Sequence, residues 1–188
     1  AWRLGQLLQG GPHADLPVLS AVAPFKAGGR GGPENYTEIP AGPLLLRHLS
    51  DLYPHPNSLT ALRISGADLA LWLERSVSLY HRILPGAEDA VLIDEGFPSF
   101  NFDSIHGLTW RIDLTQPPRF DAGGRVIAPG ARRITDLRHL GQPVAADAVF
   151  AGREAGLCEI DGIDRGRGST TGVHRLGHRA EVGDDTAR

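Results

Sequence analysis

Two cations, Lys26 and Arg30, lie in a glycine-rich stretch near the start of the chain, which reads Lys26-Ala-Gly-Gly-Arg30-Gly-Gly-Pro33. Four glycines within six residues allow the backbone to turn sharply and to approach a ligand closely. A guanidinium in such a turn is suited to holding a phosphate or a carboxylate. The alternative is a surface hairpin loop with solvated charges, because the spacing matches neither standard phosphate-loop motif.

Ring side chains occur in two further loops that contain proline. Tyr53, His55 and Asn57 alternate with two prolines, and Phe100 lies between two other phenylalanines and close to a proline. Rings held in stiff loops can stack on a planar base at little ordering cost. Asn57 is a candidate to hydrogen-bond a base edge or, alternatively, to cap the turn. The alternative for the phenylalanines is that they fill the core beneath the loop.

Other catalytic chemistry has little support in the sequence. The eight histidines are dispersed; Asp103 and His106 are a weak hint of a metal pair, and His174 and His178 have ligand spacing only in the C-terminal stretch. There is no Gly-x-Ser-x-Gly motif for a serine nucleophile, and the single cysteine, Cys158, excludes an internal disulfide and a cysteine metal cluster. These patterns favour a binding module over a self-sufficient catalyst.

The composition sets broad limits on the protein class. The 188 residues are 41% hydrophobic with a net charge of −3, so we expect no nucleic-acid polymer and no membrane as a partner. The chain has no methionine and opens on Ala1, which predicts a processed product or a fragment, with no signal peptide visible.

The elements that must position these loops are predicted by periodicity. Ser65 followed by Asp68 is a capping-box pattern and predicts the clearest helix. Further apolar patterns predict two other helices and several strands. The predicted helices are Ala1–Gly10, Ala41–Leu52 and Gly66–Ile83, and the predicted strands are Leu16–Ala23, Ser58–Ile64, Leu108–Leu114 and Arg133–His139, with Val144–Phe150 leading to another. This order predicts a mixed α+β domain.

After Phe150 the sequence changes character. Residues 151–188 contain eight glycines, alternating charges and no hydrophobic period. We therefore predict a folded domain over residues 1–150 and a divergent tail over 151–188 that is disordered or weakly packed.

Four stretches in this order resemble one known family: Ala23–Pro33, Asp51–Asn57, Phe97–Asp103 and Ala131–Ile134. They resemble the C-terminal, substrate-binding domain of bacterial 2′,3′-cyclic-nucleotide 2′-phosphodiesterase/3′-nucleotidase, within the 5′-nucleotidase superfamily. The resemblance runs from about Gln6 to Phe150. It implies a mixed β-sheet packed with two main helices.

The resemblance also implies roles for the site residues. Arg30, with Lys26 nearby, would contact the substrate phosphate. His55 would form one wall of a base-stacking slot, because in the family this wall lies two residues before an asparagine, which here is Asn57. The family usually has Tyr or Phe at the position of His55. The nearby Tyr53 is the alternative residue for stacking on the base.

The family's second stacking wall is an aromatic residue followed by a glycine-rich run. Just after Phe150 this chain reads Ala151-Gly-Arg-Glu-Ala-Gly-Leu-Cys158 instead. The abrupt change suggests a frameshift or a gene-end artefact.

In the resembled family, an N-terminal metallophosphatase domain carries a pair of divalent metals, and the motifs of that domain are absent from this sequence. The resemblance therefore implies the nucleotide-binding portion of a periplasmic hydrolase of nucleotide catabolism. We expect no metal bound by this chain and a metal pair in the missing domain. Whether the chain is an enzyme stays open, and alone it is expected to be inactive. The alternatives are an inert standalone or vestigial nucleotide-binding module and a structural domain that binds nothing.

Overall fold

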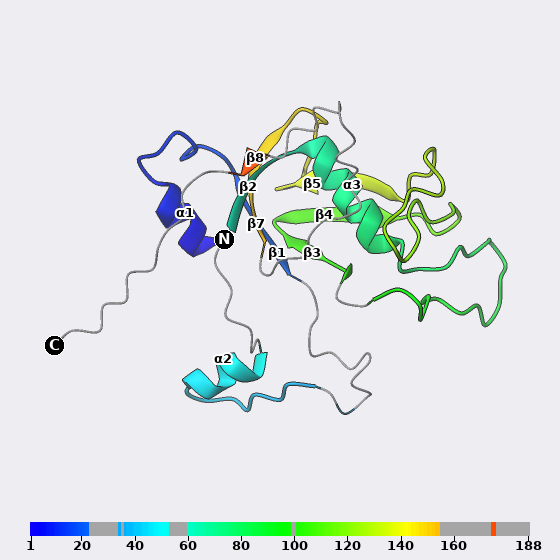
Figure 1. The fold of residues 1–188 in the computed structure, drawn as a ribbon, viewed down its shortest axis with the longest axis horizontal. Coiled ribbons are helices and arrows are strands. Elements are labelled where there is room, and N and C mark those ends of the chain that lie inside the picture. Colours follow the sequence, from blue (N-terminus) through cyan, green and yellow to red (C-terminus); the bar gives the residue numbers. More distant parts are fainter. Residues whose placement is uncertain (23–33, 35, 53–59, 99–100, 155–173, 176–188) are drawn as a thin grey trace.

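The computed structural model describes residues 1–22, 34, 36–52, 60–98, 101–154 and 174–175. Within these residues the chain forms two β-sheets, with one long helix packed between strands of both (Figure 1). The predicted α+β class with a mixed sheet is confirmed.

The larger sheet has five strands in the order β3-β1-β7-β2-β8. Its central strand β7 runs parallel to β1, whereas the β1–β3, β2–β7 and β2–β8 pairs are antiparallel. The strands are β1 (Val18–Val22), β2 (Thr60–Ser65), β3 (Ser104–His106), β7 (Val149–Glu154) and β8 (His174–Arg175).

The smaller sheet is an antiparallel set of three strands, β4 (Leu108–Ile112), β5 (Ile134–His139) and β6 (Gln142–Pro143). It follows the larger sheet directly, because only Gly107 separates β3 from β4. Gly107 has φ +98°, and a Cβ there would lie 3.0 Å from the side chain of Leu19. Glycine therefore allows both the left-handed turn and the close approach to β1.

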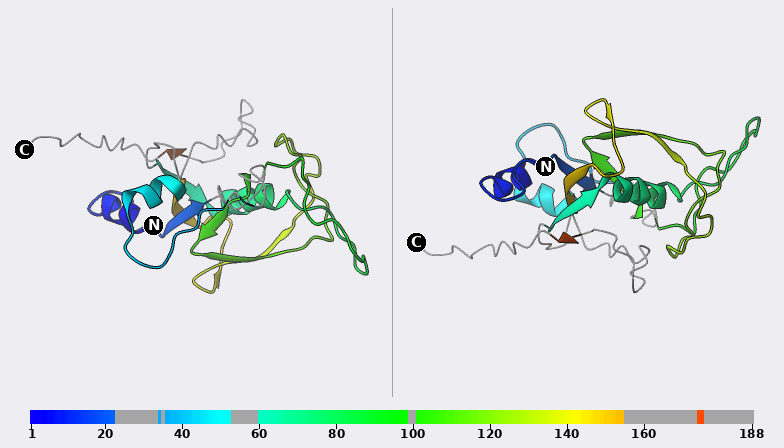
Figure 2. Two further views of the ribbon diagram at one scale, coloured as in Figure 1. Left: turned by 90° about the horizontal axis from the view of Figure 1, so that it is seen from below. Right: turned by 90° about the horizontal axis from the view of Figure 1, so that it is seen from above.

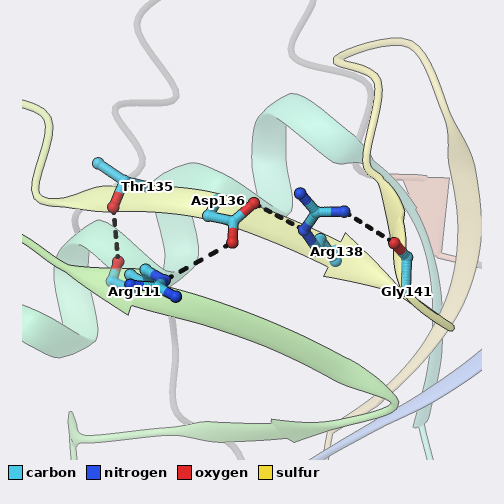
Figure 3. Close-up of polar contacts among 5 residues, drawn as sticks. All are labelled: Arg111, Thr135, Asp136, Arg138 and Gly141. Atoms are coloured by element: carbon cyan, nitrogen blue, oxygen red, sulfur yellow. Dashed lines mark hydrogen bonds and ion pairs between the residues drawn. The ribbon is translucent and has the colours of Figure 1, made fainter.

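Strand β5 contains a bulge, where Asp136 and Leu137 lie opposite the single residue Trp110. Asp136 adopts φ +52°, a conformation that aspartate tolerates better than most residues. Its carboxylate accepts a 2.6 Å hydrogen bond from Arg138 Nε and lies 3.7 Å from Arg111 Nε (Figure 3). Exposed pairs of this kind contribute at most about 1 kcal/mol to stability.

Helix α3 (Gly66–Val77) is the element on which both sheets pack. The predicted capping box is confirmed: the Asp68 amide donates to Ser65 Oγ, and the Ser65 amide donates to the Asp68 carboxylate. The buried core contains residues of α3 and of strands from both sheets. Its members are Leu19, Ala21, Ile64, Leu69, Trp72, Leu73, Ile105, Leu108 and Phe150.

Helix α3 ends at Val77, six residues before the predicted end at Ile83. After it, Tyr80 forms an antiparallel bridge with Ile93, and the His81 amide donates to the Leu92 carbonyl. The chain between Tyr80 and Ile93 extends away from both sheets (Figure 2). Apolar periodicity alone does not reveal this change of hydrogen-bond partner.

The two other helices are α1 (Trp2–Leu8), which is as predicted, and α2 (Leu46–Leu52), which begins later than the predicted Ala41. Gly42 has φ +144°, which is outside the helical region. At the observed start, His48 Nδ1 accepts a hydrogen bond from the Leu45 amide. This side chain therefore satisfies a backbone donor that a helix start leaves unpaired.

The predicted boundary at Phe150 lies inside a strand. β7 continues to Glu154, and Ala151 is fully buried with its amide donating to the Pro17 carbonyl. Residues His174–Arg175 pair with β2 as β8. The sequence after Phe150 has no apolar period and so gave no sign of this extension. The strand forms nevertheless, because the hydrogen bonds between strands come from the backbone and not from the side chains. The other residues of the predicted tail lie outside the described residues.

Candidate functional site

The predicted phosphate-binding and base-binding side chains lie outside the described residues. They are Lys26, Arg30, Tyr53, His55, Asn57 and Phe100. The structure does describe the strands and the helix from which their segments depart. The candidate site is therefore defined by this framework.

The segments that carry the predicted residues adjoin strand ends. The segment with Lys26 and Arg30 follows Val22, the last residue of β1, and the segment with His55 precedes Thr60, the first residue of β2. Phe100 precedes Ser104, the first residue of β3.

Strand register places these ends together. Val22 pairs with Ser104 across the antiparallel β1–β3 ladder, and Thr60 pairs with Glu154 across the β2–β7 ladder. β1 and β7 are parallel, with Ser20 opposite Arg153, so both strands end on the same side. The ends of β1 and β7 and the starts of β2 and β3 therefore share one end of the five-stranded sheet.

The chain just after Phe100 is held by α3. Trp72 Nε1 donates a 2.7 Å hydrogen bond to Asp103 Oδ2, and the Asp103 amide donates to Ser76 Oγ at 3.2 Å. Trp72 and Ser76 are both buried. Burial raises the pKa of Asp103, and the indole hydrogen bond opposes this rise. Asp103 thus serves as an anchor, which is a different role from the metal pair with His106 that its spacing suggested.

The chain just before Phe100 is also packed against α3. Phe97 is buried, and the guanidinium carbon of Arg75 lies 4.4 Å from its ring centroid. On the other side of Phe100, the ring of Phe102 lies edge-on to that of Tyr80, with ring centroids 5.7 Å apart. The core alternative is therefore correct for Phe97.

Sequence reasoning missed two buried charged residues near the other end of α3, Arg133 and Glu74. Arg133 is 0% exposed, and its guanidinium donates to the carbonyls of Val77 at 3.0 Å, Tyr80 at 2.6 Å and Gln116 at 3.0 Å. Two of these acceptors lie at the helix C-terminus, where carbonyls lack intrahelical partners and a cation is favourable. Arg133 therefore ends the helix and joins it to the smaller sheet.

Glu74 compensates part of this buried charge. Its Oε1 accepts a 2.7 Å hydrogen bond from the Ile134 amide, and it is 5% exposed. Burial raises its pKa, whereas backbone hydrogen bonds and the charges of Arg119 and Arg133 oppose the rise. A signal was present in the sequence: Glu74 directly follows the core residue Leu73, and a charge beside a core position requires a partner.

The four sequence motifs all lie within the match to one known protein family. The family model for the 5′-nucleotidase C-terminal domain matches residues 18–152. The chain belongs to this family. The resemblance carried by the motifs is thereby confirmed, and the match includes the first residues after Phe150 that β7 adds to the sheet.

Curated relatives of this 5′-nucleotidase C-terminal domain are longer proteins. The trifunctional nucleotide phosphoesterase protein YfkN of Bacillus subtilis is 37% identical over 150 residues, which are 79% of this chain and 10% of YfkN. The 2′,3′-cyclic-nucleotide 2′-phosphodiesterase/3′-nucleotidase of Haemophilus influenzae is 44% identical over 73% of this chain and 21% of its own length. The Yersinia enterocolitica protein of the same name is 42% identical over 76% and 22%. The chain thus spans 10 to 22% of these relatives.

A crystal structure assigned as a 5′-nucleotidase from Staphylococcus aureus, in complex with α-ketoglutarate, matches 72% of this chain and 22% of that one, with a TM-score of 0.46 and 18% identity. In the described part of this domain, no three His, Cys, Asp or Glu residues are grouped to hold a metal ion. No helix among the same residues is long and apolar enough to cross a membrane.

Proposed function

We propose that this chain is the nucleotide-binding portion of a metal-dependent nucleotidase and cyclic-nucleotide phosphodiesterase that hydrolyses phosphate esters in nucleotide catabolism. One observation carries the proposal: the segments with the predicted phosphate-binding and base-binding residues all adjoin one end of the five-stranded sheet. The relatives' names support the substrate class, since they are nucleotide phosphoesterases and nucleotidases.

Two kinds of contact would bind the nucleotide. Arg30, assisted by Lys26, would hold the phosphate, because a guanidinium can form charge-assisted, bidentate hydrogen bonds with phosphate oxygens. His55, Tyr53 and Phe100 would supply ring faces for the base. Asn57 would hydrogen-bond an edge of that base. The ligand would be a 3′-nucleotide or a 2′,3′-cyclic nucleotide.

The hydrolytic step belongs, in this proposal, to an N-terminal metallophosphatase domain with a divalent metal pair. The described residues contain no grouping that fits a metal, so no step is assigned to a metal held by this part of the chain. A periplasmic location is part of the proposal and is supported by the resemblance to the family alone.

Binding can be tested by isothermal titration of adenosine 3′-monophosphate into this chain and into Arg30→Ala. Loss of one charge-assisted contact costs about 1.5–3 kcal/mol, which is about a ten- to hundredfold weaker affinity. Arg132→Ala is the matched control, because it also removes one positive charge and Arg132 is an exposed arginine in a different motif, Ala131–Ile134.

The proposal is supported if Arg30→Ala weakens binding by this factor and Arg132→Ala leaves it unchanged. Equal affinities of the wild type and Arg30→Ala would overturn the phosphate role of Arg30. Undetectable binding by the wild type at millimolar nucleotide would overturn the proposed function of this chain and favour the structural-domain alternative. Binding by a chain whose gene has no adjoining metallophosphatase domain would favour the standalone-module alternative.

A further inference from the structure

Helix α2 and the two residues before it carry a group of exposed leucines, which we call the leucine face. Its members are Leu44, Leu45, Leu46 and Leu49, and their exposed fractions range from 45% to 82%. Leu49 lies three residues after Leu46 and four after Leu45, which is the spacing of neighbours on one side of a helix. Among the side chains of α2 that the structure describes, only that of His48 is buried.

This helix lacks a packing partner for its apolar side. None of the described strands or helices packs closely on α2, and Figure 1 shows it apart from both sheets. The Thr37 hydroxyl donates to the Asp51 carbonyl at 3.0 Å, but this polar contact leaves the leucines exposed. A helix of seven residues is marginal in water unless an apolar side packs on another surface. Because grouped apolar side chains on a surface mark interaction sites, the leucine face has the character of a docking surface.

The size of the leucine face argues against a second copy of this chain as its partner. Four leucines at these exposures present on the order of 400 Å² of apolar surface. A stable complex of two separate proteins buries about 800 Å² on each partner. A domain of the same polypeptide needs a smaller contact, because its linker holds it at an effective concentration on the order of millimolar.

The proposed function supplies such a tethered partner. The chain spans 10 to 22% of its curated relatives, so most of each relative lies outside the match. In the proposed function, the metal pair and the nucleotide-binding residues belong to different domains. Both must contact the same phosphate if the metals are to activate a water against it. The two domains must therefore touch, and their contact needs a surface on this chain.

We propose that the leucine face is the docking surface for the N-terminal metallophosphatase domain, which would contact it through an apolar patch of its own. This inference rests on the proposed function and goes beyond it by naming the surface that joins the two domains. By helical spacing, Arg47 and Asp51 lie on the opposite side of α2, so the contact itself is apolar.

A second group of exposed apolar side chains provides an internal comparison. It lies on the chain that extends away from both sheets and consists of Leu84, Val91, Leu92 and Ile93. This group differs from the leucine face because Glu88 and Asp89 lie within it, and charges that become buried require partners.

Hydrogen exchange measured by mass spectrometry compares this chain with the full polypeptide that its gene encodes. Docking should slow exchange of residues 46–52 by about tenfold or more in the full polypeptide, because buried leucines stabilise the helix against opening. Leu46→Asp and Leu49→Asp should abolish this slowing, and both positions are exposed, so the domain itself should still fold. Leu140→Asp is the matched control, because Leu140 is 84% exposed between β5 and β6 and should leave the slowing unchanged.

The outcomes separate this inference from its alternatives. Equal exchange of α2 in the two proteins overturns it, and so does slowing confined to residues 84–93. Sedimentation velocity should find this chain monomeric, whereas a dimer that Leu46→Asp abolishes would assign the leucine face to a second copy. If this chain binds adenosine 3′-monophosphate but α2 is not slowed, this inference alone is refuted. A gene without a metallophosphatase domain would refute the proposed function as well.

Discussion

Replacing Arg133 by methionine should strongly destabilise the domain. The change keeps much of the side-chain volume but removes three hydrogen bonds, to the carbonyls of Val77, Tyr80 and Gln116. It also leaves Glu74 buried with less compensating positive charge. A buried carbonyl that loses its donor costs about 1–3 kcal/mol, so losing three donors should cost about 3 kcal/mol or more. Since domains are stable by about 5–15 kcal/mol, this is a large fraction of the total.

Urea denaturation followed by circular dichroism measures this loss directly. Arg132→Met is the matched control, because it removes the neighbouring exposed arginine and should change stability by less than about 0.5 kcal/mol. Adding Glu74→Gln to Arg133→Met should recover part of the loss, since the unpaired buried charge is then gone. An Arg133→Met loss below about 1 kcal/mol would refute the structural role derived from these contacts.

Two further perturbations test the fold. Burial raises the pKa of Asp103, so the ionised carboxylate costs stability. Relative to Asp103→Asn, the wild type should therefore lose stability as the pH rises from the ordinary aspartate pKa through the raised one. Urea titrations at a series of pH values measure this difference. Asp113 should behave oppositely, because hydrogen bonds from the Thr115 hydroxyl and amide lower its pKa. Relative to Asp113→Asn, the wild type should be more stable above the ordinary aspartate pKa and should lose this advantage as the pH falls. Equal pH profiles for the Asp103 and Asp113 variants would contradict both assignments. Gly66→Ala should lower the thermal midpoint because the new Cβ would overlap the Ala145 carbonyl oxygen. Gly5→Ala meets nothing within 4 Å and should raise the midpoint; the opposite order would contradict this packing.

Local patterns in the sequence were sufficient to predict the main elements. The Ser65 capping box defined the start of α3, and apolar patterns located β1, β2, β4 and β5 to within about two residues. The four motifs identified the family because several stretches occurred together in one order. Each stretch alone, including the glycine-rich run, allowed a structural interpretation.

Contacts between distant residues were the part that sequence reasoning could not supply. The end of α3 depends on Arg133, which lies far along the chain from Val77, and no local signal connects them. The apolar spacing within α3 is consistent with a buried Trp72, but it does not reveal that the indole N–H also bonds Asp103. The full length of β7 depends on pairing with β1 and β2 on either side. Whether the predicted site residues converge stays a prediction, because these residues lie outside the described ranges.

The central claim is that a nucleotide binds at one end of the five-stranded sheet. The most direct test records ¹⁵N–¹H NMR spectra of this chain during titration with adenosine 3′-monophosphate. If a nucleotide binds there, the amides of Val22, Thr60 and Ser104 should shift most among the described residues, since they adjoin the predicted binding segments. The Leu140–Gly141 turn of the smaller sheet should not shift. Shifts concentrated at that turn, or none at the strand ends under saturating nucleotide, would contradict the claim.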